Sequence, residues 1–223
     1  MAARSLVCPI VKRGPRLDGK LDDAEWKQAV EITGMTDLAG KRRAPQQTTL
    51  RMLRTGKALY IAVRAEEPHI KDPSFFDAGY TYPLRIDPEP SGYLWWFESV
   101  EIFFDPGRDR RDVTQIMLNP YGLKEGFVFD SVRYGFYGKE NDVHKDWPVE
   151  GYCNMLDDAW TLEFRVPLSA FGKEAEAPLW GFNICRNRRL RVGNGMKYST
   201  WTPLAWGFQD AKNFGKLTFA NGE

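Results

Sequence analysis

The sequence is built from short segments in which apolar and polar residues alternate, and these segments recur between turn residues from about residue 48 to the end. An alternation of period two places successive side chains on opposite faces of a strand, so it is typical of strands with one buried face. The clearest case is residues 48–64, where two such segments flank Thr55-Gly56-Lys57 and predict a β-hairpin. The pattern restricts the chain to a fold made mainly of strands.

Further strands are predicted at residues 99–104, 114–118, 126–132, 159–166, 180–186, 198–202 and 216–219. Helix signals are few. Residues 22–26 offer an N-cap, early acids and an apolar residue for one or two turns, and residues 167–171 predict one more turn. Many short strands with little helix favour an all-β fold, a two-sheet antiparallel β-sandwich of the jelly-roll kind, because it buries the apolar face of each sheet.

Residues 1–223 are predicted to form a single domain, since β-sandwiches often reach this length as one unit. One segment, residues 66–94, differs from the rest because five prolines and five aromatic residues punctuate it. We expect a long loop there, and loops of this length are usually functional or mobile.

Composition excludes several classes of protein. Hydrophobic residues make up 43% of the chain, which is enough for a sizeable core, and the net charge is only +1. A near-neutral charge argues against a nucleic-acid partner, and there is no apolar run of about 18 residues to cross a membrane. Cys8, Cys153 and Cys185 are odd in number and widely spaced, so we expect free structural thiols. We also expect a monomer.

The N-terminus lacks the apolar stretch that a signal peptide needs before charge returns at Lys12 and Arg13. The chain as given is therefore expected in the cytoplasm unless a signal was removed. Common phosphate-binding, dinucleotide-binding, zinc-protease and hydrolase motifs are absent, which lowers the expectation of an enzyme. Glu98 and Glu101 are three residues apart and should lie on opposite strand faces, so they would not converge as glycosidase carboxylates. No catalytic residue is predicted.

The candidate functional residues begin with the run Trp95-Trp96-Phe97-Glu98-Ser99-Val100-Glu101. A sugar presents apolar C–H faces and hydroxyl edges, so a sugar site needs flat rings and a few charged or amide groups. Trp95 and Trp96 cannot both point inward from a strand, and Glu101 lies on the outward face of the predicted strand. A second aromatic cluster near the C-terminus comprises Trp201, Trp206 and Phe208.

Six segments, taken in order, resemble the family 9 carbohydrate-binding modules. They are Leu17-Asp-Gly-Lys-Leu-Asp-Asp-Ala-Glu-Trp26, Leu59-Tyr-Ile-Ala-Val63, the run from Trp95 to Asp105 with its Ser-Val-Glu-Ile-Phe core, Trp160-Thr-Leu-Glu-Phe-Arg-Val-Pro167, Trp180-Gly-Phe-Asn-Ile184 and Phe214-Gly-Lys-Leu217. Together they span nearly the whole chain.

The resemblance implies a sandwich that holds a glucan or xylan chain end, or a free mono- or disaccharide, between two facing aromatic rings. It implies Trp95 as the first ring and Glu101 as a hydrogen-bond acceptor, with Gln115 and Asn119 as polar groups on the next strand. Phe208 falls at the position of the second ring, and Trp206 is two residues away. The roles of Trp96 and Glu98 stay open between pocket wall and scaffold.

Two positions depart from the family pattern. Phe208 stands where the family has Trp, and Met117 stands where characterised sugar binders carry a basic residue. Arg186 or Arg188 is the candidate for the missing donor. Without a basic donor at the position of Met117, a charge-assisted hydrogen bond worth roughly 1.5–3 kcal/mol is missing, so weaker sugar binding is expected.

Non-catalytic carbohydrate binding is therefore the leading hypothesis, with no cofactor required. The resemblance also implies a structural calcium site, whose ligands the sequence does not identify, and an extracellular or periplasmic location if a signal was removed. Two alternatives stay open. One is a haem-binding electron-transfer domain of the related fold, with Met117 and His144 as axial ligands. The other is a glycan-active enzyme of unrecognised chemistry.

Overall fold

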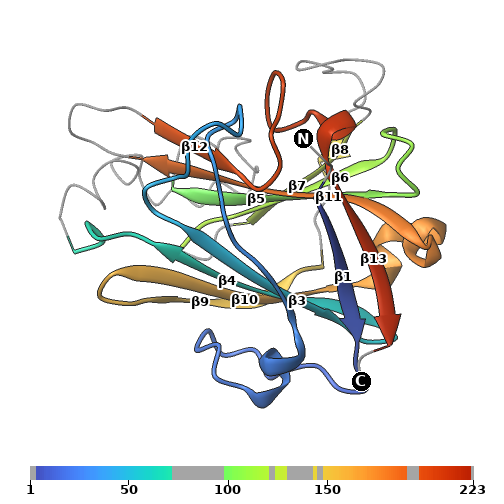
Figure 1. Ribbon diagram of the computed structural model, residues 1–223. Helices are drawn as coiled ribbons and strands as arrows, with labels where there is room; N and C mark the ends of the chain where they lie inside the picture. The colour runs from blue at the N-terminus through green and yellow to red at the C-terminus, as the bar shows by residue number, and fades with distance from the viewer. Residues whose placement is uncertain are drawn as a thin grey trace.

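The computed structural model describes residues 4–71, 98–120, 124–129, 143–144, 148–189 and 196–221. Within them the strands form two layers that face each other (Figure 1). One layer contains β5 (Ser99–Pro106), β6 (Val113–Leu118), β7 (Lys124–Phe129), β8 (Val143–His144), β11 (Leu179–Arg189) and β12 (Met196–Thr200). The other contains β2 (Val30–Ile32), β3 (Thr48–Arg54), β4 (Ala58–Glu66), β9 (Glu150–Met155) and β10 (Ala159–Pro167).

Two further strands, β1 (Ser5–Ile10) and β13 (Gly215–Asn221), join the layers. β13 pairs with β11 in the first layer, and β1 pairs with β13 on one side and with β3 of the second layer on the other. The strand order β8-β7-β6-β5-β11-β13-β1-β3-β4-β10-β9 is therefore one hydrogen-bonded path that curls into a sandwich. Both pairings of β1 are parallel, whereas the other strand pairs are antiparallel among the described residues.

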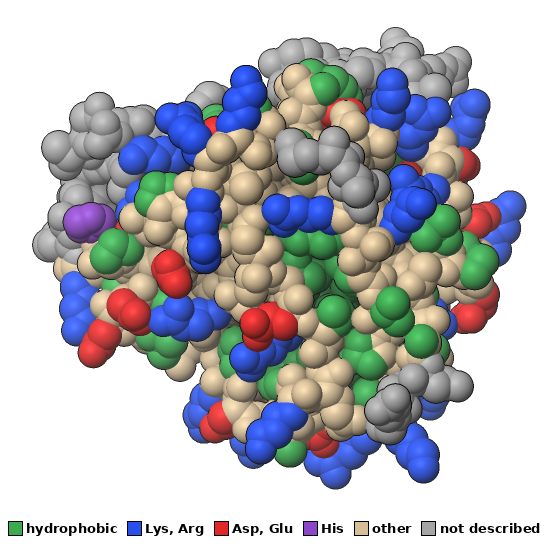
Figure 2. All heavy atoms as spheres, in the orientation of Figure 1, with side chains coloured by type: hydrophobic (Ala, Val, Ile, Leu, Met, Phe, Trp, Pro, Cys, Tyr) green, Lys and Arg blue, Asp and Glu red, His purple; other side chains and the backbone are tan. Residues whose placement is uncertain are grey.

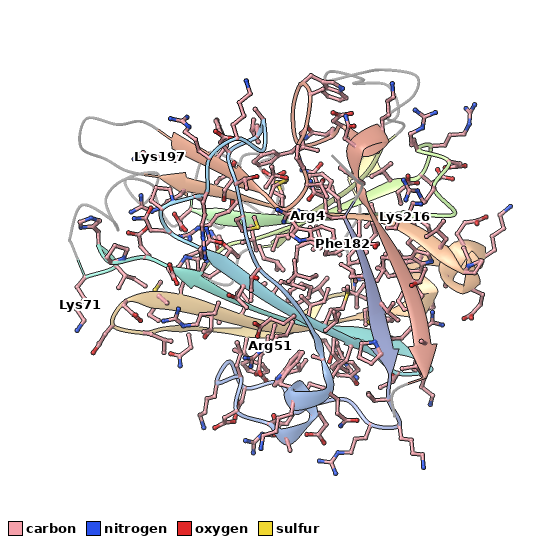
Figure 3. All side chains as sticks on the ribbon, in the orientation of Figure 1. Arg4, Arg51, Lys71, Phe182, Lys197 and Lys216 are labelled. Atoms are coloured by element: carbon pink, nitrogen blue, oxygen red, sulfur yellow. The ribbon has the colours of Figure 1, made fainter. Side chains whose placement is uncertain are left out.

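The main core lies between the layers and is lined by alternate residues of strands from both, among them β3, β4, β5, β10 and β11. In β5, Val100, Ile102 and Phe104 point into it, as the sequence pattern predicts. Phe182 on β11 packs against Phe104 with ring centroids 5.5 Å apart, and Figure 3 shows Phe182 between the two layers. Burial of these large side chains is the main source of stability of such a sandwich.

The outer face of the first layer is also buried. Phe103 on β5 packs there against Phe214, with ring centroids 5.4 Å apart, and Leu204 and Phe208 belong to the same cluster. The segment 201–214, which includes the 3₁₀ turn η5 (Ala211–Asn213), therefore covers part of this face. A strand buried on both faces explains why every residue of β5 is buried.

Glu163 on β10 fixes the N-terminal segment to the outer face of the second layer. Its carboxylate accepts hydrogen bonds from the backbone N–H groups of Asp18, Gly19 and Leu21 at 2.7–3.1 Å. It also accepts one from Nε1 of Trp26 at 2.7 Å. Trp26 lies in the 3₁₀ turn η1 (Ala24–Gln28). One buried carboxylate therefore holds residues 17–26, the first of the six segments that resemble the family.

The predicted fold class is confirmed, including the hairpin of β3 and β4 and the short turns η1 and η4 (Leu168–Glu176). β1, β2, β8 and β9 were not predicted, and the parallel pairing of β1 differs from the expected antiparallel arrangement. The single domain stays a prediction. Most of the predicted loop 66–94 lies outside the described residues.

The surface carries basic and acidic side chains interspersed on the face shown in Figure 2, in keeping with the near-neutral net charge. No helix among the described residues is long and apolar enough to cross a membrane. All three cysteines are free, with Cys8 and Cys185 fully buried and Cys153 half-buried. The expectation of unpaired thiols is therefore confirmed.

Candidate functional site

A buried polar cluster lies on the outer face of the first layer, where β5 is flanked by β6 and β11. We call Ser99, Glu101, Gln115, Asn119 and Asn187 the Glu101 group. The Glu101 carboxylate accepts a hydrogen bond from Nε2 of Gln115 at 2.7 Å and another from Nδ2 of Asn187 at 2.6 Å. Asn187 also contacts Oγ of Ser99 at 3.1 Å. One carboxylate therefore orients amides from both neighbouring strands.

Strand register explains why these side chains meet. Glu101 is paired with Met117 on β6 and with Cys185 on β11, and side chains opposite each other share a face. Gln115 and Asn187 lie two residues away along their strands, so alternation returns them to the same face. Asn119 directly follows β6 and falls on this face by the same alternation. The sequence had predicted Glu101, Gln115 and Asn119 here, but not Asn187.

Aromatic rings lie beside this group. Tyr198 on β12 is paired with Asn187, and its ring contacts Phe208 edge-on with centroids 5.6 Å apart. Phe208 is only 8% exposed, whereas Tyr198 and Trp206 are each 44% exposed. Among the described residues, Tyr198 is therefore an accessible ring beside this group, and Trp206 is an accessible ring in the segment 201–214 that covers part of the same face. The sequence interpretation missed Tyr198, although its position in a predicted strand, two residues from Thr200 and so on the same face, could have indicated it.

Trp95 and Trp96 lie outside the described residues, so the stacking role of Trp95 stays a prediction and the role of Trp96 stays open. Met117 is fully buried next to Glu101, and the side chain of His144 is not among those described. Within the described ranges, no group of three or more His, Cys, Asp and Glu side chains could hold a metal ion. The structural calcium site and the haem alternative stay untested.

Arg186 and Glu98 lie on the other side of the sheet from Glu101. Arg186 donates to Oε1 of Glu98 from Nε at 2.8 Å and from Nη2 at 2.5 Å, and Nε1 of Trp160 donates to the same oxygen at 3.0 Å. Trp160 belongs to the core between the layers. Arg186 is paired with Val100, a core residue, so it cannot be the donor that completes the Glu101 group. This corrects the placement of Arg186 and Glu98 with Glu101 in one site.

This core-side pair extends into a larger ionic network. Arg188 donates to both carboxylate oxygens of Glu67 at 2.6 and 2.8 Å, and Nη2 of Arg186 lies 3.6 Å from Oε2 of Glu67. Burial raises the pKa of the Glu98 carboxyl above its ordinary value, and the adjacent Arg186 lowers it in part. Two acids and two arginines thus pair at one end of the sandwich, and the arginines of β11 in the first layer contact Glu67, which follows β4 of the second layer.

The positions of the two glutamates also bear on catalysis. Glu98 is bonded to core-side residues and Glu101 to outer-face residues, so a strand separates the two carboxylates. The predicted opposite orientation is confirmed. A glycosidase needs its two carboxylates to face one bond, and this pair does not.

The chain was compared with known families and structures. A family model described as carbohydrate family 9 binding domain-like matches residues 17–222. A carbohydrate binding module family 9 from Caldicellulosiruptor kristjanssonii in complex with cellotriose superposes with a TM-score of 0.64 at 15% identity, covering 99% of this chain and 95% of that chain. A family 9 module of the same organism in complex with glucose has a TM-score of 0.64 at 15% identity, with coverages of 99% and 97%.

A Bacteroides uniformis protein, described only provisionally as carbohydrate-binding, superposes with a TM-score of 0.69 at 14% identity, covering 98% of this chain and 100% of that chain. At such identities the structural likeness shows the fold. A search of curated protein sequences finds no significant match.

Proposed function

Because the chain belongs to the carbohydrate family 9 binding domain-like family, we propose that it binds a carbohydrate without changing it chemically, and that the Glu101 group makes the polar contacts. The observation that carries this proposal is the Glu101 carboxylate held between two amides on one face of the sheet. Carboxylate and amide groups in fixed directions can accept from and donate to vicinal hydroxyls. Tyr198 offers an accessible ring nearby, and Trp206 and Trp95 are proposed as further stacking rings.

The burial of Glu101 sets a condition on binding. Its side chain is only 2% exposed and that of Asn187 only 1%. A sugar reaching Glu101 therefore needs the covering side chains to move, which costs part of the binding free energy. This cost adds to the expected weakening from Phe208 and Met117, so we expect affinities in the micromolar to millimolar range rather than tighter ones.

The ligand class proposed is a β-glucan chain end or a short gluco-oligosaccharide, because the two structurally similar family 9 modules are complexes with cellotriose and with glucose. A protein that binds such polysaccharides works where they occur, so an extracellular or periplasmic location is proposed with it. Membership of a family of binding domains and the separation of Glu98 from Glu101 both favour binding over hydrolysis.

The test is a calorimetric titration of cellotriose, glucose and xylotriose into wild type and Glu101→Gln. We expect Glu101→Gln to weaken binding at least tenfold, because an ionic acceptor of two amide hydrogen bonds is lost. Glu31→Gln is the matched control, since Glu31 pairs with Arg51 on the exposed side of the second layer. Trp95→Ala tests the proposed ring. The proposal would be contradicted if the wild type showed no heat of binding with any of the three sugars. Equal affinities of wild type and Glu101→Gln would also contradict it.

A further inference from the structure

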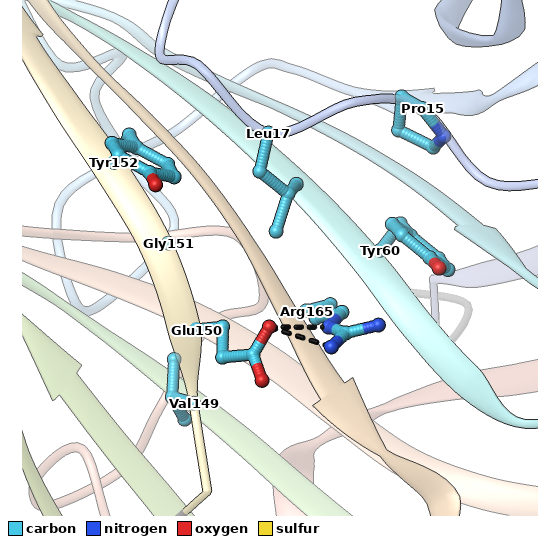
Figure 4. Close-up of a pocket in the computed structure, with 8 residues that line it drawn as sticks. All are labelled: Pro15, Leu17, Tyr60, Val149, Glu150, Gly151, Tyr152 and Arg165. Carbon is cyan, nitrogen blue, oxygen red and sulfur yellow. Dashed lines mark hydrogen bonds and ion pairs between the residues drawn. The ribbon is translucent and has the colours of Figure 1, made fainter.

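A concave site lies on the outer face of the other layer, far from the Glu101 group in the strand order. Its volume is about 660 Å³, and its lining includes Pro15, Leu17, Tyr60, Glu150, Tyr152 and Arg165 (Figure 4). We call it the Tyr152 cleft. A volume of this size falls within the range of small-molecule pockets, roughly 300–1,000 Å³.

Strand register forms the floor of the cleft. Arg165 on β10 is paired with Tyr60 on β4 and with Glu150 on β9, so these three side chains form one row across three strands. Tyr152 lies in the next row, paired with Glu163. Tyr60 and Tyr152 therefore flank β10 from its two neighbours, roughly 10 Å apart across the sheet. The row of Tyr60 also carries the ion pair of Glu150 with Arg165 that Figure 4 draws.

The walls of the cleft are fixed by the N-terminal segment. Glu163 holds Asp18, Gly19 and Leu21 through their backbone N–H groups, which places the preceding residues Pro15 and Leu17 over β4 and β10. Gly14 lies against the ring of Tyr60 so closely that a Cβ there would be 2.2 Å from Cζ. The ring of Tyr60 is thus pinned as a wall, and the cleft exists before any ligand arrives.

The free binding groups of the cleft are a ring and an ion pair. Tyr152 is 59% exposed and stands at the edge of the cleft as a large apolar surface with a hydroxyl. Arg165 donates from Nε to Oε2 of Glu150 at 2.9 Å, and the two side chains are 42% and 66% exposed, so solvent or a ligand can reach their polar atoms. The pair carries no net charge, so the cleft favours neither an anion nor a cation. A neutral ligand with a flat apolar face and hydroxyl edges fits this chemistry.

We propose that the Tyr152 cleft is a second carbohydrate site, in which one sugar ring stacks on Tyr152 and its hydroxyls bind Glu150 and Arg165. This goes beyond the proposed function, because the cleft lies on the opposite outer face and shares no residue with the Glu101 group. A chain with two such sites can hold two sugar segments at once, or one long polysaccharide at two places.

The test uses cellotriose as the probe, with calorimetry and backbone amide chemical shifts as the readouts. In the Glu101→Gln background we expect residual binding whose shift changes map to β4, β9 and β10. Adding Tyr152→Ala should weaken that residual binding at least tenfold. Arg51→Ala is the control, because Arg51 forms an exposed ion pair on β3 of the same layer but lies outside the cleft. Circular dichroism checks that each variant is folded, as expected for the truncation of an exposed ring.

Two results would overturn the second site. One is the absence of residual cellotriose binding in Glu101→Gln, and the other is residual binding that Tyr152→Ala leaves unchanged. The two proposals fail separately. If Tyr152→Ala alone abolishes binding and Glu101→Gln has no effect, the Tyr152 cleft stands and the Glu101 group is not the sugar site.

Discussion

Glu163 illustrates how much structure one side chain can hold. Its two carboxylate oxygens accept four hydrogen bonds from a segment about 140 residues away in sequence, and the side chain has no exposed surface. Buried polar groups of this kind are costly once a partner is lost. The same carboxylate also fixes one wall of the Tyr152 cleft.

We predict that Glu163→Gln lowers the free energy of unfolding by about 2–4 kcal/mol, because the new NH₂ group faces donors and at least two hydrogen bonds are lost. Urea unfolding followed by tryptophan fluorescence measures this. Glu31→Gln, which alters an exposed ion pair with Arg51, should change stability by less than about 0.5 kcal/mol. Equal effects of the two substitutions would show that the Glu163 hydrogen bonds contribute little.

Asp105 predicts a dependence of stability on pH. Burial raises the pKa of its carboxyl to about 6, although the backbone N–H of Arg110 donates to it at 3.1 Å. In the unfolded chain an aspartate has a pKa of about 3.9. Between these values the folded chain binds a proton that the unfolded chain has released, so this group stabilises the fold at low pH and the contribution is lost as pH rises through 6.

The expected size of this contribution is about 2–3 kcal/mol between pH 4 and pH 7, at 1.36 kcal/mol for each pKa unit. Asp105→Asn removes it. The difference in stability between wild type and Asp105→Asn should therefore shift in favour of the variant as pH increases, in urea titrations at several pH values. Parallel pH profiles of the two proteins would rule out the raised pKa.

At the scale of single elements, β9 depends on close contact with β10. A Cβ on Gly151 would lie 2.5 Å from both the carbonyl oxygen of Glu163 and Cβ of Phe164. At Gly56, in the turn between β3 and β4, a Cβ would meet nothing within 4 Å. The two glycines therefore form a matched pair for one substitution.

Gly151→Ala is predicted to lower stability by about 1–3 kcal/mol, since the added methyl group must push β9 away from β10. Gly56→Ala should stay within about 0.5 kcal/mol of wild type. Thermal unfolding by calorimetry compares them directly. Similar melting temperatures for both variants would mean that β9 can shift without cost.

Most strands were predictable because apolar and polar residues alternate clearly in their sequences, as in β3, β4 and β10. β9 was missed because its sequence, Glu-Gly-Tyr-Cys-Asn-Met, is largely exposed and has no strong apolar alternation. β1 was missed because it is short and contains Pro9, which a sheet interior rarely accepts. Its parallel pairing depends on the distant β13, and no local pattern encodes that.

The candidate site was predictable in part for the same reason. The outward face of β5 identified Glu101, and the resemblance supplied Gln115 and Asn119. Arg186 was wrongly grouped with them, although its place in the alternation of β11 indicates the face of the sheet on which it lies. Trp180, Phe182 and Ile184 point into the core, so Arg186 must follow them inward while Asn187 points outward. The ion pair with Glu98 and Glu67 could not be predicted, because it joins segments distant in sequence.

For the whole molecule, the single hydrogen-bonded path through β1 and β13 predicts that the two layers unfold together. Cys8 on β1 and Cys185 on β11 report on this path. Burial raises the pKa of the Cys8 thiol to about 12 and that of Cys185 well above its ordinary value, so both thiols are protonated and unreactive in the folded chain.

Variants that keep only Cys8 or only Cys185 should therefore become reactive toward a thiol reagent at the same urea concentration. The half-buried Cys153 should react earlier, as a positive control for the reagent. A lower midpoint for Cys185 than for Cys8 would show that the first layer opens separately, against the single-domain prediction.

The parallel pairing of β1 with β13 has a mechanical consequence. Both strands run in the same direction, so Ser5 begins one strand beside Lys216 and Asn221 ends the other beside Ile10 (Figure 1). A force pulling the start of β1 away from the end of β13 loads the ladder in shear, and its backbone hydrogen bonds resist together instead of opening one after another. Forced unfolding depends on the unfolding rate rather than on equilibrium stability. The parallel pairing is thus expected to resist tension applied between β1 and β13.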